Sequence, residues 1–293
     1  MGRQMIRVVI LFLVISSGFH PGILKGIDNV VIGEELADRS PVTDKCVPEN
    51  LAFFPGEEVE YLVYYNWGIL WVNAGLVRFN VKERMFRNRP VYHFDAFGTT
   101  HRRYDWLFKV RDRFQSFVDK ETFRPVWYGM DTYEGGYVAR DIYHYLPEKN
   151  QVITITENSD RPRQTDTLNI KACSFDVITA IYAARNLDFD SYEINDPIPF
   201  SILISNELYD LNPRYLGRET IRTRQGATYD CIKFSVELVE GFIFSKGNKM
   251  SVWVTDDENR IPVLVESQIR IGSVKAMIQS YSGLRNPETA RID

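Results

Sequence analysis

The chain has 293 residues, of which 44% are hydrophobic and 25% charged, as is typical of a soluble globular protein. Its formal charge of -4 argues against nucleic-acid binding, which requires a basic surface to neutralise phosphates. Aromatic residues make up 13% of the chain, a bias that favours β-strands, so sheet is the expected secondary structure.

The first 18 residues resemble a targeting segment. Arg3 and Arg7 precede an apolar run at residues 8–15, and small residues follow at 16–18. This order is typical of a cleaved secretory signal peptide, so we expect an exported protein. Neither this run nor any later one reaches the 20 or so apolar residues of a membrane-spanning helix, so we expect a protein that is soluble after cleavage, with no transmembrane segment.

Residues 19–45 lack periodicity and predict a poorly ordered leader. A single β-rich domain is expected over residues 46–293. Its first half predicts short strands separated by turn signals, which is typical of a meander. The expected strands are 58–67, 76–83, 91–97, 109–118, 124–130, 137–146 and 152–156. Gly135 and Gly136 predict a hairpin turn between two of them, and Gly75 predicts a bulge or a close backbone approach.

Residues 174–185 break this pattern, because their apolar side chains recur with a helical period. Ser174 is the expected N-terminal cap. Asp176 suits the positive N-terminal end of the helix dipole, and Arg185 suits the negative C-terminal end. Apolar residues surround most of the helix circumference, which predicts a buried helix.

A second group of strands is expected at 198–204, 215–224, 229–239, 249–255, 261–270 and 273–280. No linker rich in Pro, Gly or Ser separates the two groups. The predicted fold class is therefore mainly β: one large curved antiparallel sheet, or an open β-barrel, with one buried α-helix.

Three cysteines, Cys46, Cys173 and Cys231, have no CxxC spacing and no clustered histidines beside them, so we expect no metal site and no cofactor. In an oxidising compartment one pair can form a disulfide, but the sequence does not choose among three pairings. Three unpaired thiols are the alternative.

We expect no catalytic residues. The histidines beyond the leader are isolated, and no nucleophile motif is present. The acidic run Asp256-Asp257-Glu258 falls at a predicted hairpin, where solvated turn residues are expected rather than a calcium or acid-base site. The segment 101–106 mixes cations, an acid and aromatic residues; it is suited to a sugar or an anionic head group, or to a loop salt bridge.

Several short motifs are similar to those of the exported bacterial proteins grouped as domain of unknown function 3108. Together they span nearly the whole predicted domain. They are PGEEVEY at 55–61, NWG at 66–68 with AG at 74–75, VRD at 110–112, DVITA at 176–180 with Tyr182 and Arg185, and WVTDD at 253–257 with RIPV at 260–263. The resemblance implies an envelope location and a β-rich fold, and it brings no catalytic residues to carry over.

The leading functional hypothesis is a non-enzymatic envelope protein whose curved sheet holds an apolar or amphiphilic, lipid-like ligand or docks an envelope protein partner. Candidate ligand-binding residues are Trp67, Trp71, Tyr182 and Arg185. Alternatively, aromatic residues such as Trp67, Trp71, Phe97 and Trp127 fill the space under the sheet. Two other functions remain open: an enzyme acting on envelope glycans, and a scaffold that binds through exposed sheet edges.

Overall fold

The computed structural model describes residues 45–47, 49, 52–67, 70–237, 249–268 and 272–293. The predicted signal peptide, and the leader apart from Lys45, lie outside these residues. In the described residues, a 13-stranded antiparallel sheet runs in the order β12-β13-β14-β15-β16-β1-β2-β3-β4-β5-β6-β7-β8. Because β8 and β12 are its two edges, the sheet is curved but open, as the sequence predicted.

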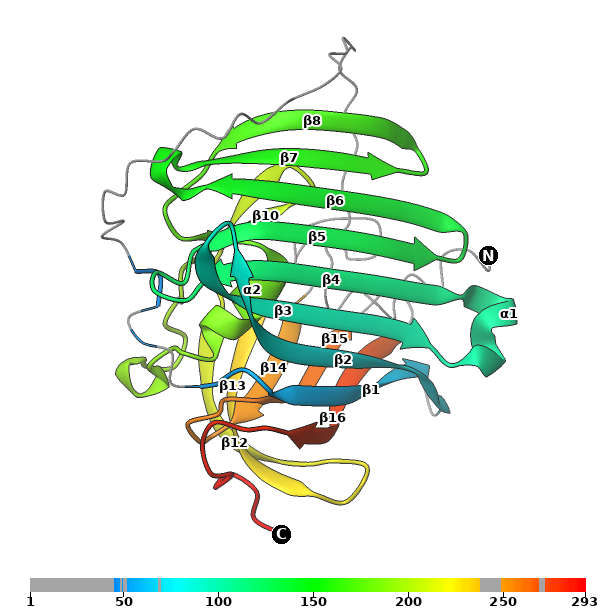
Figure 1. Cartoon of the computed structure of the whole chain (residues 1–293). Coiled ribbons are helices and arrows are strands. Elements are labelled where there is room, and N and C mark those ends of the chain that lie inside the picture. The colour runs from blue at the N-terminus through cyan, green and yellow to red at the C-terminus, as the bar shows by residue number, and fades with distance from the viewer. Residues whose placement is uncertain (1–44, 48, 50–51, 68–69, 238–248, 269–271) are drawn as a thin grey trace.

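The strands β1 to β8 form the broad layer at the front of Figure 1. Each pairs with the next in the chain, and short turns join most of them. Their bounds are β1 Glu58–Trp67, β2 Leu70–Phe86, β3 Arg89–Thr100, β4 Val110–Asp119, β5 Pro125–Glu134, β6 Tyr137–Leu146, β7 Gln151–Asn158 and β8 Arg161–Asn169. A short helix, α1 (Asp105–Phe108), joins β3 to β4.

The remaining strands of the large sheet lie behind this layer in Figure 1. They are β12 Arg214–Arg222, β13 Thr228–Glu237, β14 Lys249–Thr255, β15 Pro262–Gln268 and β16 Ser273–Ser282. The last strand, β16, pairs with the first, β1, so the two groups become one sheet. The predicted ends of two strands, at 238–239 and 269–270, fall outside the described residues.

The predicted helix is α2 (Val177–Ala184), which lies behind β3 and β4. A small sheet of β9 (Ser174–Phe175), β10 (Phe200–Ile204) and β11 (Glu207–Leu211) lies beside it. The prediction of Ser174 as the helix cap was wrong, because Ser174 pairs with β10 as part of β9. Asp176 is the cap instead, and its carboxylate accepts a hydrogen bond from the Thr179 amide at 2.9 Å.

Gly75 has the role predicted for it, although it lies inside β2 rather than in a loop. A Cβ atom at this position would stand 2.1 Å from the carbonyl oxygen of Thr99 on β3. The register between β1 and β2 also shifts next to it, between Val63 and Tyr64. Only glycine permits this approach of two backbones, and the bulge increases the local bend of the sheet.

Two of the three cysteines form a disulfide, and the structure decides which two, as the sequence could not. Cys46 is bonded to Cys173, which ties the chain before β1 to the segment before α2, and Cys231 is a buried free thiol. The alternative of three unpaired thiols was therefore wrong. Burial raises the pKa of Cys231 to about 12, so this thiol stays protonated and unreactive at neutral pH.

Candidate functional site

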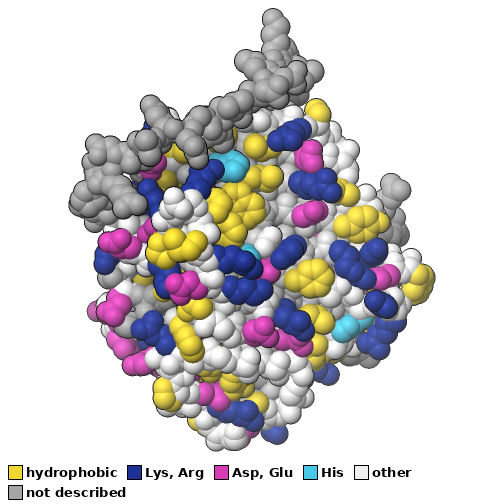
Figure 2. Space-filling view, in the orientation of Figure 1, with side chains coloured by type: hydrophobic (Ala, Val, Ile, Leu, Met, Phe, Trp, Pro, Cys, Tyr) yellow, Lys and Arg dark blue, Asp and Glu magenta, His cyan; other side chains and the backbone are white. Residues whose placement is uncertain are grey.

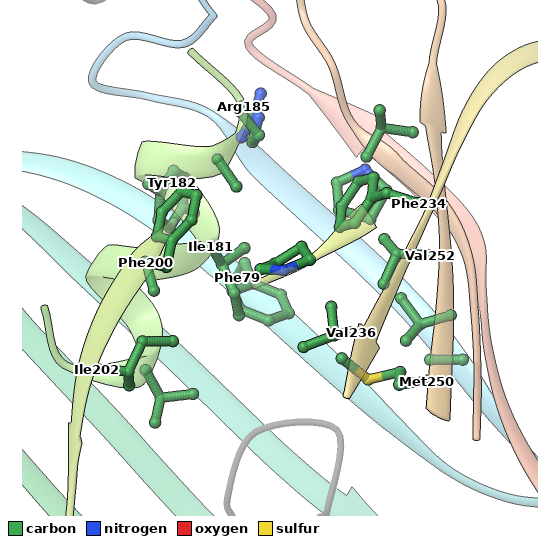
Figure 3. Close-up of a pocket in the computed structure, with 18 of the residues that line it drawn as sticks. Phe79, Ile181, Tyr182, Arg185, Phe200, Ile202, Phe234, Val236, Met250 and Val252 are labelled. Atoms are coloured by element: carbon green, nitrogen blue, oxygen red, sulfur yellow. The ribbon is translucent and has the colours of Figure 1, made fainter. Parts of the chain in front are cut away.

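A pocket of about 200 Å³ lies between α2 and the two groups of strands (Figure 3). Its walls come from β1, β2, α2, β10, β13 and β14, with further residues from β15 and β16. Side chains that project into it include Phe79, Ile181, Phe200, Ile202, Phe234, Val236, Met250 and Val252. We call this space the α2 pocket.

The pocket is apolar because alternate residues of each strand face it. Val59 and Tyr61 lie on one face of β1, and Val77 and Phe79 on one face of β2. Among the described residues that line it, only Tyr61, Tyr182 and Arg185 have a polar atom in the side chain. The site therefore offers a wide apolar surface and few groups that can orient a polar ligand.

Arg185 is the one charged residue in the described pocket lining, and its charge is already neutralised. Its guanidinium donates to the two carboxylate oxygens of Glu57, at 2.5 and 2.8 Å. It also donates to the carbonyl oxygens of Ala52 and Asn259. Burial lowers the pKa of Arg185, but the adjacent Glu57 carboxylate outweighs this effect and the pKa is raised overall.

This arrangement joins three parts of the chain that carry the family motifs. Glu57 belongs to the segment 55–61, Arg185 follows α2, and Asn259 belongs to the hairpin between β14 and β15. Arg185 and Glu57 are 4% and 1% exposed. Because a buried pair with its hydrogen bonds satisfied is directional, Arg185 serves to position α2 and leaves no free cation for an anionic ligand.

Tyr182 also lies beside the pocket, but one face of its ring is covered. It stacks on Phe94 of β3 with the ring centres 3.9 Å apart, and Phe53 meets it edge-on at 4.9 Å. Burial raises the pKa of Tyr182 well above its usual value, so its hydroxyl is neutral. Tyr182 is a wall of the pocket and not an ionic contact.

Trp71, one of the two tryptophans predicted to bind ligand, does not lie with Tyr182 and Arg185. Trp71 is not among the pocket-lining residues; Arg224 and Lys275 lie over its ring at 5.2 and 5.1 Å. Trp67 ends β1, and its side chain lies outside the described part of the structure. Since Phe97 is 41% exposed and Trp127 packs against Phe117, these two aromatic residues do not fill the pocket either.

The N-terminal end of α2 is held by a second polar group. Asp176 is fully buried and accepts hydrogen bonds from Thr179 Oγ1 at 2.7 Å and from Ser116 Oγ on β4 at 2.8 Å. Burial raises the pKa of Asp176, and these hydrogen bonds oppose that rise. Both ends of α2 are therefore fixed by buried polar contacts to other segments.

Asp112 is a buried carboxyl group on the same side of β4 as Ser116. One oxygen accepts a hydrogen bond from the Tyr133 amide at 3.0 Å, and the other has no hydrogen-bond partner among the described residues. Burial, followed by repulsion from Glu134, raises the pKa of Asp112 to about 9. The group is therefore protonated at neutral pH.

The acidic run at 256–258 differs from the solvated turn that was predicted. Asp257 is buried, and its Oδ1 accepts hydrogen bonds from Thr255 Oγ1 at 2.7 Å and from the Asn259 amide at 3.0 Å. Asp256 forms an ion pair with Arg218 at 2.7 Å. These acids shape the hairpin that presents the Asn259 carbonyl to Arg185.

In the described part of the chain, no group of three or more His, Cys, Asp or Glu residues could hold a metal ion. None of the helices described there is long and apolar enough to cross a membrane.

No curated protein sequence matches this chain at a significant level. A solved structure, "Crystal Structure of Beta-barrel-like Protein of Domain of Unknown Function DUF1849 from Brucella abortus", is similar with a TM-score of 0.51 and 8% identity, over 79% of this chain and 98% of that chain. At this identity the likeness concerns the fold alone. A family model matches residues 60–279, and the chain therefore belongs to the family described as Protein of unknown function (DUF3108).

Proposed function

We propose that this protein is an exported, non-enzymatic carrier that holds an apolar or amphiphilic ligand in the α2 pocket. The observation that carries the proposal is an apolar pocket of about 200 Å³ whose one charged residue, among those described, is already paired. An apolar cavity of about 150 Å³ in another protein stays dry and binds benzene, so this volume suits a hydrocarbon group.

The chemistry of the lining favours a hydrocarbon chain over a carboxylate or phosphate inside the pocket. Burying a charged head group without a partner is costly, and Arg185 is occupied by Glu57. The ligand would therefore place its apolar part against Phe79, Ile181 and Phe234, with any charged head in water.

The energetics point the same way. The pocket is partly open to solvent, so its apolar lining is in contact with water when no ligand is bound. A ligand that covers this lining gains about 25 cal/mol for each Å² of apolar surface removed from water. We therefore expect ligand binding to raise the melting temperature.

Export to the periplasm or cell envelope is part of the proposal. The disulfide between Cys46 and Cys173 supports it, because such bonds persist in oxidising compartments and are rare in the cytosol. The signal-like order of residues 3–18 gives independent support. Intact mass of the protein from the envelope fraction tests it: an N-terminus at or after Gly18 is expected, and retention of Met1 would contradict export by this route.

Native mass spectrometry of the protein purified from its own envelope tests the carrier function. We expect a bound lipid-like molecule of defined mass. Titration of delipidated protein with fatty acids and phospholipids should then give a saturable rise in melting temperature.

Two substitutions in α2 test whether the ligand lies in the α2 pocket. Ala184→Phe fills the pocket and should abolish the response, whereas Ile181→Ala enlarges it and should shift preference to a bulkier ligand. If both variants respond like the wild type, or no ligand saturates the protein, the carrier proposal is wrong and partner docking becomes the better hypothesis.

A further inference from the structure

The turn between β3 and β4 presents the most exposed side chain among the large hydrophobic residues described. Trp106, on α1, is 82% exposed, and its neighbour Leu107 is 57% exposed. Single exposed apolar residues are common on protein surfaces, but these two are adjacent and form one small apolar surface.

Local contacts hold this turn in place while both side chains project. The Asp105 carboxylate accepts hydrogen bonds from Arg111 at 2.7 Å and from Thr100 Oγ1 at 3.0 Å. Phe108 packs against Gly135, where a Cβ atom would lie 2.3 Å from the ring. Because contacts on either side fix the turn, Trp106 and Leu107 are exposed by its geometry and not by a loose loop.

The same turn is strongly basic. Residues 101–111 contain four basic residues and one acidic residue, a formal charge of +3 in a chain whose net charge is -4. Arg111 neutralises Asp105, which leaves Arg102, Arg103 and Lys109 without an ion-pair partner among the described salt bridges. Figure 2 shows basic and hydrophobic side chains together at the right of the molecule, where Figure 1 places α1.

We propose that this turn docks the protein onto the surface of an anionic phospholipid bilayer. Trp is favoured at the level of the lipid head groups, and a neighbouring Leu adds buried apolar area. The three unpaired cations complement the negative surface. A protein partner would require a shaped apolar patch, whereas here two apolar side chains protrude from a ring of positive charge.

The opposite end of β2 and β3 offers a natural control. The hairpin 84–89 carries Arg84, Arg87 and Arg89, and Met85 there is 69% exposed. It lies roughly 35 Å from α1 along β3, so a bilayer bound end-on at the α1 turn does not reach it. It has similar basic charge but no projecting aromatic ring, because Phe86 packs against Phe117 with the ring centres 4.9 Å apart.

The test is flotation of the purified chain with vesicles of 30% phosphatidylglycerol in phosphatidylcholine, against vesicles of phosphatidylcholine alone. Binding is expected only to the anionic vesicles, and it should weaken as salt screens the charges. The Arg102→Ala/Arg103→Ala double variant should bind about 30-fold more weakly, and Trp106→Ala about tenfold. Arg87→Ala/Arg89→Ala should bind like the wild type.

Insertion of the Trp106 side chain into the bilayer can be measured separately. Brominated lipids should quench part of the Trp fluorescence of the wild type, and this part should be lost in Trp106→Phe although the variant still binds. The wild type and all variants must begin at the same N-terminal residue, which intact mass checks. Differences in vesicle binding between them then come from the substituted side chains. Unchanged melting temperatures show that the variants are folded.

Equal losses in the α1 and hairpin double variants would overturn the proposal, since they would indicate a diffuse charge effect. Failure of the wild type to bind anionic vesicles would also overturn it. If Trp106→Ala instead breaks a stable complex seen by size-exclusion chromatography without vesicles, the surface recognises a protein. The pocket variant Ala184→Phe should float normally, so failure of the carrier proposal leaves this result intact.

Discussion

The two faces of α2 differ in how completely they are packed. On the face toward β3 and β4, Ile178 and Thr179 are fully buried and Tyr182 is 2% exposed. On the opposite face, Val177, Ile181 and Ala184 are only half-buried and line the pocket. One short helix therefore belongs to a dense core on one side and to an unfilled space on the other.

This difference in packing between the two faces of α2 shows how a protein can keep a pocket open. Cores normally pack densely, and a helix with no other contacts would move to close such a gap. Here Asp176 and Arg185 hold the two ends of α2 through buried hydrogen bonds to β4, Glu57 and Asn259. Because these contacts fix the helix, its position does not depend on what fills the pocket.

The first prediction removes the ion pair that holds the C-terminal end of α2. Arg185→Met should lower the free energy of unfolding by about 3–5 kcal/mol, because it leaves the Glu57 carboxylate buried without a partner. Denaturant unfolding measures this. Arg78→Met is the control, since its pair with Glu60 is exposed and should contribute about 1 kcal/mol or less. Similar losses in the two variants would show that the buried pair does not hold α2.

The second prediction compares the two faces directly. Ile178→Ala should cost about 2–5 kcal/mol, because it creates a cavity in a packed core. Ile181→Ala should cost about 1 kcal/mol, because Ile181 already borders empty space and loses fewer contacts. Thermal and denaturant unfolding of the ligand-free variants tests the ranking. A larger loss at Ile181 would mean that the pocket is closed in solution.

The third prediction concerns Asp112, which, unlike the buried acids Glu57 and Asp176, has a carboxylate oxygen without a described partner. Its pKa is raised from 3.8 to about 9, so the folded state retains a proton that the unfolded state releases. Stability should therefore fall as pH rises from about 4 to about 9. Asp112→Asn should flatten this slope and stabilise the protein at pH 8 by about 1–3 kcal/mol.

Unfolding measured across this pH range provides the check. Asp141, whose pKa burial raises to about 6, contributes a loss of the same sign between about pH 4 and 6, and it is present in both proteins. A difference between wild type and variant that grows above pH 6 is therefore specific to Asp112. If the two pH profiles run parallel there, the carboxyl group of Asp112 is not desolvated.

The smallest expected effect is at the hairpin that supports Arg185. Asp257→Asn should cost about 1 kcal/mol, because Oδ1 accepts from Thr255, Asn259 and Arg260 and a neutral amide accepts these bonds more weakly. Glu258→Gln, at an exposed position, is the control. An unchanged melting temperature in Asp257→Asn would mean that this carboxylate acts only as a solvated turn residue.

Much of the fold could be predicted from local pattern. Three strands, β1, β6 and β14, begin and end at the predicted residues, because alternation and turn signals coincide there. The strand β8 was missed because both of its faces are polar at the edge of the sheet, so it shows no alternation. The two-residue β9 and the five-residue β11 are too short to carry a pattern.

The sequence by itself determined the fold class, the helix near residues 177–184 and the family, since each depends on periodicity or on motifs that are local in the chain. Tertiary structure alone decided that Arg185 pairs with Glu57, 128 residues away, and that Trp71 lies apart from the pocket. Periodicity shows which side chains share a face. Which faces then meet depends on long-range strand pairing and the curvature of the sheet, and these decide whether a space remains between them.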